Sequence, residues 1–164
     1  MHRQICVLFG VLILSLCAPV RGAQPPSDYE RLQPLEWLIG EWVGEYTAPF
    51  DLSPWKKGDH VVSYASQRWL LNRSFLAYDL SVEVNGKKTP DTHELAGYDR
   101  AGKKLVHWIY AQGGAGSGEW TEVGEKAVLR WSVDLPEGKL VGTSHLQKKD
   151  ADSYSWQARD VSLG

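Results

Sequence analysis

Cysteine is almost absent from this sequence. The chain of 164 residues contains two, Cys6 and Cys17, and both lie at its N-terminal end. Beyond them there is no thiol, which excludes a disulfide, a thiolate nucleophile and a cysteine metal site in the rest of the chain. A folded domain built from that remainder must be stabilised by the packing of its core alone.

An excess of positive charge is absent as well. The sequence has 18 Lys and Arg against 20 Asp and Glu, a formal net charge of −2. A protein that binds a phosphate backbone needs a basic surface, so the composition predicts no nucleic-acid partner. The 43% hydrophobic and 23% charged residues are ordinary values, which argue against intrinsic disorder.

Long apolar runs are limited to one, at residues 5–20. It has 16 residues, fewer than the roughly 20 that span a bilayer. Arg3 precedes it and Val20-Arg21-Gly22 ends it, so residues 1–22 are predicted to be a secretory signal peptide cleaved after Gly22. The protein is then secreted or periplasmic. Two alternatives stay open: an uncleaved membrane anchor, and a lipoprotein attached through Cys17, which the bulky Leu16 before it disfavours.

Cleavage after Gly22 would leave 142 residues with 16 basic and 20 acidic side chains, a formal charge of −4. A chain of that length buries roughly 68% of its unfolded surface, which is enough for one stable domain. No membrane span is expected after cleavage.

Aromatic and β-forming residues outweigh the strong helix formers. The chain has eight Trp beside three Phe and one Met, a composition that favours strands. Asn85-Gly86 is the strongest hairpin signal, and the glycines between 113 and 118 predict a flexible loop. Short strands are expected between the turn residues, at 42–48, 60–71, 75–84, 92–98, 105–111, 119–123, 127–133, 140–146 and 154–161.

These strands have no long crossover helix between them, so neighbours should pair antiparallel. The predicted fold is all-β: a single up-and-down meander of about nine or ten strands, closed into a barrel because closure removes the exposed edges. Residues 28–38 are the one helical segment, capped by Ser27 or Asp28. The expected organisation is a tether and short helix at 23–34, followed by a barrel domain at 35–164.

Four segments resemble one known family. They are Leu35 to Glu45 with its Gly40-Glu41-Trp42, Trp69 to Leu76, Gly97-Tyr98-Asp99, and Gly116-x-Gly118-x-Trp120. Together they resemble the lipocalin-like (calycin) superfamily, and within it bacterial exported domains of unknown function. The resemblance extends from residue 35 to residue 159. It implies a lipocalin-like barrel and carries little information on function, because such barrels hold many unrelated ligands.

The resemblance also implies a structural pair at the closed end of the barrel. Trp42 would close that end, with Gly40 letting the chain pass close to the indole. Arg159, on the last strand, would lay its guanidinium across the Trp42 ring in a cation–π contact. The alternative is that Trp42 is ordinary core and Arg159 an ordinary surface charge.

Known catalytic and metal-binding motifs are missing. His93-Glu94 begins a zinc-protease motif, but Gly97 stands where the second His is needed, so no metal is predicted. Nucleophile and dinucleotide motifs fail in the glycine-rich segment. No cofactor is predicted; related barrels bind haem, and His145 is the one credible axial ligand here.

The aromatic residues therefore carry the functional prediction. The candidates for an aromatic-lined pocket with a few polar groups are Trp69, Tyr78, Glu94, Trp108, Tyr110, Arg130, Trp131, His145 and Trp156. The first hypothesis is an exported module that binds a small apolar or amphipathic molecule. The second is a non-catalytic structural or partner-binding domain whose barrel is filled, with the apolar loop 50–55 as its contact. A haem-binding or acid–base enzyme is the third.

Overall fold

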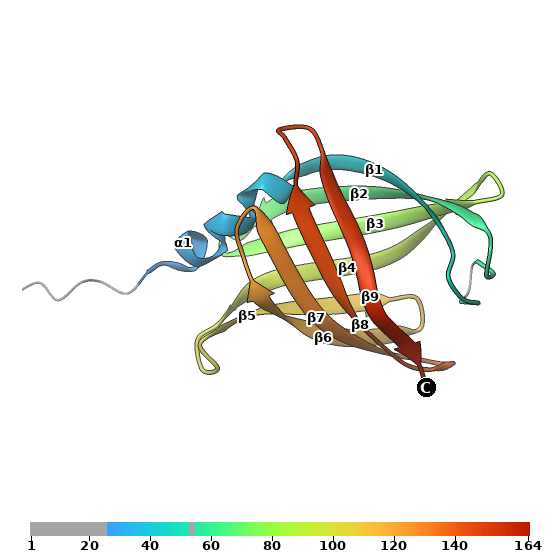
Figure 1. Cartoon of the computed structure of the whole chain (residues 1–164). Coiled ribbons are helices and arrows are strands. Elements are labelled where there is room, and N and C mark those ends of the chain that lie inside the picture. Colours follow the sequence, from blue (N-terminus) through green and yellow to red (C-terminus); the bar gives the residue numbers. More distant parts are fainter. Residues whose placement is uncertain (1–25, 53–54) are drawn as a thin grey trace, which may run out of the picture.

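The computed structural model describes residues 26–52 and 55–164. The predicted signal peptide and the lipoprotein alternative at Cys17 lie outside the described residues. The chain forms nine strands in an unbroken antiparallel meander, so the all-β prediction is confirmed (Figure 1). The strands are β1 Gly40–Thr47, β2 His60–Leu70, β3 Phe75–Val84, β4 Lys87–Asp99, β5 Lys104–Ala111, β6 Gly114–Glu122, β7 Lys126–Leu135, β8 Gly138–Lys148 and β9 Tyr154–Leu163.

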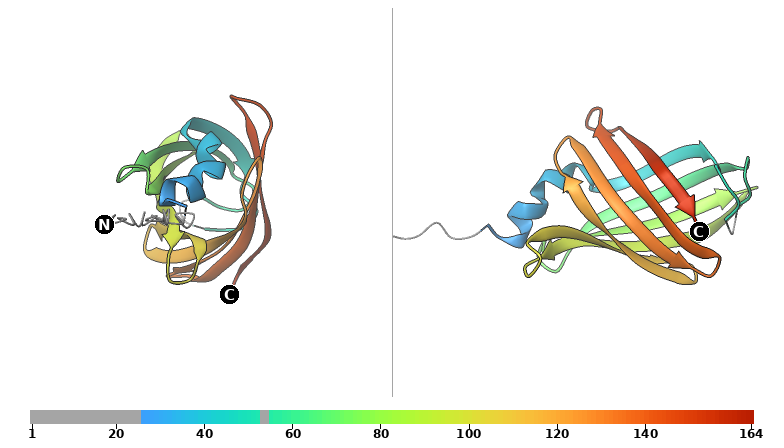
Figure 2. Two further views of the ribbon diagram at one scale, coloured as in Figure 1. Left: turned by 90° about the vertical axis from the view of Figure 1, so that its left-hand side faces the viewer. Right: turned by 60° about the horizontal axis from the view of Figure 1, so that its bottom comes forward.

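The sheet curls into a half-barrel (Figure 2). Each strand pairs with its neighbours in sequence order, and among the described strands no backbone register joins β1 to β9. Side chains connect these two edges instead. The ring centroids of Trp42 and Tyr154 lie 4.8 Å apart, and those of Tyr46 and Trp156 lie 6.2 Å apart. We call these four residues the aromatic seam.

Two short helices precede the sheet and cover one of its ends (Figures 1 and 2). In α1 Asp28–Leu32 the side chains of Ser27 and Glu30 form a capping box, as the predicted Ser27 cap requires. The 3₁₀ helix η1 Gln33–Leu38 follows, with a proline in its first turn. Leu32, Leu35 and Leu38 are buried and join a core cluster with β3, β4, β6 and β7.

The glycine-rich segment is not a loop, and that prediction is wrong. Residues 114–122 form β6, between β5 and β7. A Cβ at Gly116 would collide with the Ser132 carbonyl oxygen, and one at Gly118 would lie 2.6 Å from that of Arg130. The glycines are there because β7 approaches β6 closely, as it does where a sheet bends sharply.

The Asn85-Gly86 hairpin between β3 and β4 is confirmed. Both residues have positive φ, 53° and 74°, as a two-residue turn of this type needs. The hairpin extends β4 back to Lys87, ahead of the predicted start at residue 92. A register shift follows, because Leu80 pairs with Thr92 while Ser81 pairs with Pro90. Asp91 is therefore the extra residue of a β-bulge.

Candidate functional site: an interior cavity

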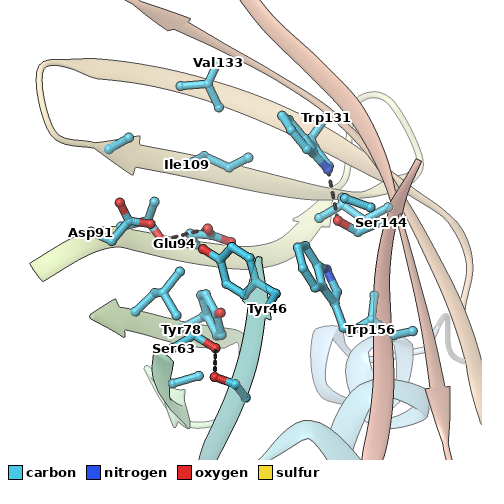
Figure 3. A pocket seen from close by; sticks show the side chains of 18 of the residues that line it. Tyr46, Ser63, Tyr78, Asp91, Glu94, Ile109, Trp131, Val133, Ser144 and Trp156 are labelled. Atoms are coloured by element: carbon cyan, nitrogen blue, oxygen red, sulfur yellow. Dashed lines mark hydrogen bonds between the residues drawn. The ribbon is translucent and has the colours of Figure 1, made fainter. Parts of the chain in front are cut away.

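The half-barrel holds a cavity of about 1040 Å³. It lies between the helix-covered core cluster and a smaller cluster around Val61 and Val82. Alternate residues of β2, β3, β5, β7 and β8 face it, since side chains of a strand point to opposite faces in turn. Consecutive residues of the edge strands β1 and β9 also line it. Figure 3 shows its aromatic and apolar wall, which includes Tyr46, Tyr78, Ile109, Trp131, Val133 and Trp156.

A polar cluster interrupts this wall on β4 and β5. Glu94 and His107 both face the cavity, and a carboxylate oxygen of Glu94 is hydrogen-bonded to His107 Nε2. The Thr92 hydroxyl donates to the other oxygen of Glu94 at 2.9 Å. His107 is only 6% exposed, and its ring lies edge-on to Trp120 at 5.6 Å. The two strands therefore hold a fixed acid–imidazole pair inside an apolar chamber.

Asp91 adds a second carboxyl to the cluster. The bulge on β4 turns it into the cavity, next to Glu94 (Figure 3). Burial, with a smaller contribution from the Glu94 charge, raises the pKa of Asp91 to about 6. Its carboxyl group therefore changes charge near neutral pH rather than near pH 4.

Two tyrosine hydroxyls share this environment. Burial raises the pKa of Tyr78 well above 10, and the Glu94 carboxylate adds to the effect. Burial also raises the pKa of Tyr46 to about 12, with Asp91 as the lesser cause. Both phenols stay protonated at neutral pH and can donate hydrogen bonds.

Four of the nine predicted pocket residues line the cavity: Tyr78, Glu94, Trp131 and Trp156. The Trp131 indole N–H donates to the Ser144 hydroxyl at 3.0 Å, which fixes the ring against the wall. Trp156 is 50% exposed and packs on Tyr46 across the aromatic seam.

The other five predicted residues are not among those that line the cavity. On β5 the lining residues are His107, Ile109 and Ala111, so Trp108 and Tyr110 point to the outer face. The same alternation puts Arg130 between the lining residues Leu129 and Trp131, and His145 between Ser144 and Leu146. Trp69 packs at the helix-covered end, where its ring lies 5.4 Å from that of Tyr29.

Sequence reasoning missed Asp91, His107, Tyr46 and Gln67, all of which line the cavity. The bulge that exposes Asp91 to the cavity has no clear sequence signal. The inward set of β5 mixes His, Ile and Ala, whereas the outward set carries Trp and Tyr, so the aromatic residues indicated the wrong face. Gln67 is a buried polar residue on β2, a position that periodicity alone does not mark.

Arg159 does not stack on Trp42. Among the cation–π contacts of the described residues none joins this pair, and the guanidinium donates to Gln157 on its own strand at 2.8 Å and 3.1 Å. Trp42 instead contacts Tyr154 and donates its N–H to the Leu38 carbonyl at 2.7 Å. Gly40 has φ +139°, and its Cβ position would lie 3.7 Å from the indole nitrogen, so the close approach is present.

The residues considered as metal or haem ligands lie as follows. In residues 26–52 and 55–164, no three His, Cys, Asp or Glu side chains form a group that could hold a metal ion. His145, the candidate haem ligand, is not a lining residue. His107 does line the cavity, but Glu94 already engages its Nε2. None of the helices in the described part of the chain is long and apolar enough to cross a membrane.

No protein-family model, curated protein or solved structure matches this chain. The resemblance to the lipocalin-like superfamily thus rests on the sequence segments alone, and the half-barrel rests on the structure.

Proposed function

We propose that this chain is an exported, lipocalin-like module that binds a small, partly apolar molecule inside its half-barrel. The cavity of about 1040 Å³ is the observation that carries the proposal. Ligand sites are typically clefts of roughly 300–1000 Å³ with an apolar wall and a few polar groups that fix orientation. Asp91, Glu94, His107 and the Tyr78 hydroxyl supply such groups.

The alternative of a filled, partner-binding barrel has less support. A cavity of that size is not a filled interior, and the loop expected to meet a partner turns inward instead. Phe50, Leu52 and Trp55 line the cavity, and the Trp55 ring lies 6.4 Å from that of Tyr46. Residues 53 and 54 are outside the described residues.

Native mass spectrometry of the protein purified from its own host tests the proposal directly. We expect a bound small molecule that is released on unfolding. A pair of variants adds a control through the neutral, fluorescent dye Nile red: Ala111→Trp places an indole in the cavity, and Tyr110→Ala alters the outer face. Ala111→Trp should weaken binding by at least about tenfold and Tyr110→Ala should not. Equal binding by both variants would contradict the proposal.

A second candidate, acid–base catalysis, is favoured by the cluster of Asp91, Glu94 and His107. A carboxyl group with a pKa near neutrality in an apolar chamber is suited to proton abstraction. Deprotonation of 5-nitrobenzisoxazole reports on a base in the cavity. If Asp91 acts so, the rate rises with pH through about 6 and is lost in Asp91→Asn. A rate equal to that of the same buffer without protein would remove this candidate.

A further inference from the structure

The charged side chains that line the cavity are nearly all of one sign. Five are acidic: Asp91 and Glu94 lie in the interior, and Glu45, Glu137 and Asp152 are exposed to solvent. No lysine or arginine is among the lining residues in the part of the chain that the structure describes. The whole sequence has almost as many basic as acidic residues, 18 against 20, so composition does not explain this.

The basic residues make their contacts elsewhere. Lys88 lies over the ring of Tyr64, Lys104 pairs with Glu119 at 2.8 Å, and Arg31 lies over Tyr98. None of these partners lines the cavity. No lysine or arginine among the described residues therefore balances these carboxylates; the bases that contact them are two histidines, His107 at Glu94 and His60 at Glu45.

The hydrogen bonding of the cluster leaves acceptors without donors. Glu94 is bound by Thr92 and His107, but within the described residues Asp91 makes no side-chain hydrogen bond or ion pair. His107 Nδ1 is buried without a partner in the same part of the chain, and so are two donors of the wall, the indole N–H groups of Trp55 and Trp120. When His107 is neutral and donates from Nε2 to Glu94, Nδ1 is a further acceptor. Unsatisfied buried acceptors are costly, and a ligand that carries N–H groups would satisfy them.

The aromatic residues of the cavity wall also suit a ligand that carries N–H groups. Tyr46, Tyr78, Trp131 and Trp156 line the cavity around the carboxylates (Figure 3). Aromatic faces attract cations as well as apolar groups, so they bind both halves of an amphipathic ammonium compound. An anionic ligand would meet two carboxylates and no lysine or arginine, with His107 already bound to Glu94.

We propose that the ligand of this cavity is an amphipathic cation: an amine or ammonium group on an apolar body, with its positive end at Asp91 and Glu94. This inference rests on the proposed function and specifies its ligand class. The titratable groups around Asp91 are Glu94, Tyr46 and Tyr78, and His107 is bound to Glu94. The tyrosines are neutral, so the two carboxylates and His107 set the charge of the site.

Displacement of Nile red by three ligands of one chain length tests the charge preference: decylamine, decanol and decanoate. At pH 8 we expect decylamine to bind at least about tenfold more tightly than decanol, and decanoate to bind most weakly. Asp91→Asn should remove most of the difference between amine and alcohol. Asp134→Asn, which changes an exposed acid on β7, should leave it intact. The preference should also decrease as the pH is lowered through about 6, where Asp91 becomes protonated.

The outcomes separate the two proposals. Equal binding of amine and alcohol, or tightest binding of decanoate, would overturn the cationic ligand and leave a cavity that binds apolar molecules. Failure of Nile red itself to bind, together with no ligand in native mass spectrometry, would overturn the proposed function. Far-UV circular dichroism of each variant confirms that a loss of binding does not come from unfolding.

Discussion

The Asp91 carboxylate is part of the proposed ligand site, yet its charge lowers the stability of the folded protein. A raised pKa means that the folded protein favours the protonated carboxyl, so the charged form destabilises the fold. In the unfolded chain the group titrates near 3.9, and in the folded chain at about 6. The free energy of unfolding therefore falls as the pH rises from about 4 through 6, and the loss is complete above that.

Asp91→Asn should consequently stabilise the protein at neutral pH. The carboxamide has the same shape and no charge, so we expect a gain of roughly 2 kcal/mol at pH 7.5 and little change at pH 4. Urea unfolding at the two pH values measures this. Asp134→Asn should show no such pH dependence, and a destabilised Asp91→Asn at pH 7.5 would contradict the assignment.

The indole N–H of Trp131 has one acceptor, the Ser144 hydroxyl, while its ring packs over Gly142. Ser144→Ala removes the acceptor of its indole N–H, which then lies in the cavity wall without a partner. We expect a loss of about 1–2 kcal/mol in the free energy of unfolding. Ser132→Ala, at the neighbouring position of β7, is the control and should change stability by less than about 0.5 kcal/mol. Equal effects would show that the hydrogen bond contributes nothing specific.

At the scale of elements, β6 determines both the bend of the sheet and the space inside it. Gly114, Gly116 and Gly118 share the face of Trp120, which lines the cavity. They have no side chains to fill the interior, and they let β7 lie close. The same residues therefore permit the close approach of the two strands and the curvature of the sheet.

Replacing Gly116 should be far more harmful than its position in a polar strand suggests. In Gly116→Val the Cβ collides with the Ser132 carbonyl, so β6 and β7 cannot keep their register. We expect at least about 3 kcal/mol of destabilisation, or no folded protein. Ser117→Val on the exposed face is the matched control. Thermal unfolding compares them, and a stable Gly116→Val with unchanged dye binding would contradict this role.

The turns and the order of the strands were predictable from the sequence because each depends on local chemistry. Asn85-Gly86 and Ser27 have side chains or φ preferences that specify one local structure. Which face of a strand points inward depends on its neighbours across the whole sheet. Trp108 and Tyr110 are larger and more apolar than His107, yet the register of β4 and β5 puts His107 inside. The bulge at Asp91 likewise results from pairing, not from an unusual residue.

At the scale of the whole molecule, an odd number of antiparallel strands makes the first and last run parallel. β1 and β9 meet through the aromatic seam, while β2 to β8 each have two hydrogen-bonded neighbours. The half-barrel is therefore held by the fewest backbone hydrogen bonds where β1 and β9 meet. The sequence predicted a closed barrel because closure removes the exposed strand edges. The structure joins the two edges through side chains, and the distances between those rings cannot be derived from the periodicity of the strands.

Hydrogen exchange should reveal this unequal stability. We expect the amides of β1 and β9 to exchange faster than those of β3 and β4. Tyr154→Ala, which removes ring contacts with both Trp37 and Trp42, should speed exchange in β1 and β9 further and leave β3 and β4 protected. Tyr110→Ala, on the outer face, is the control. Uniform exchange across all nine strands would contradict the assignment.

The seam also has a consequence for how a molecule reaches the interior. Separating β1 from β9 breaks no main-chain hydrogen bond among the described residues, only ring contacts worth roughly 0.5–1.5 kcal/mol each beyond the area they bury. For the ligand proposed above we therefore expect a sideways route between the two outer strands, in place of one past the loops at the end of the half-barrel. Loading rate then depends on how quickly two pairs of rings separate.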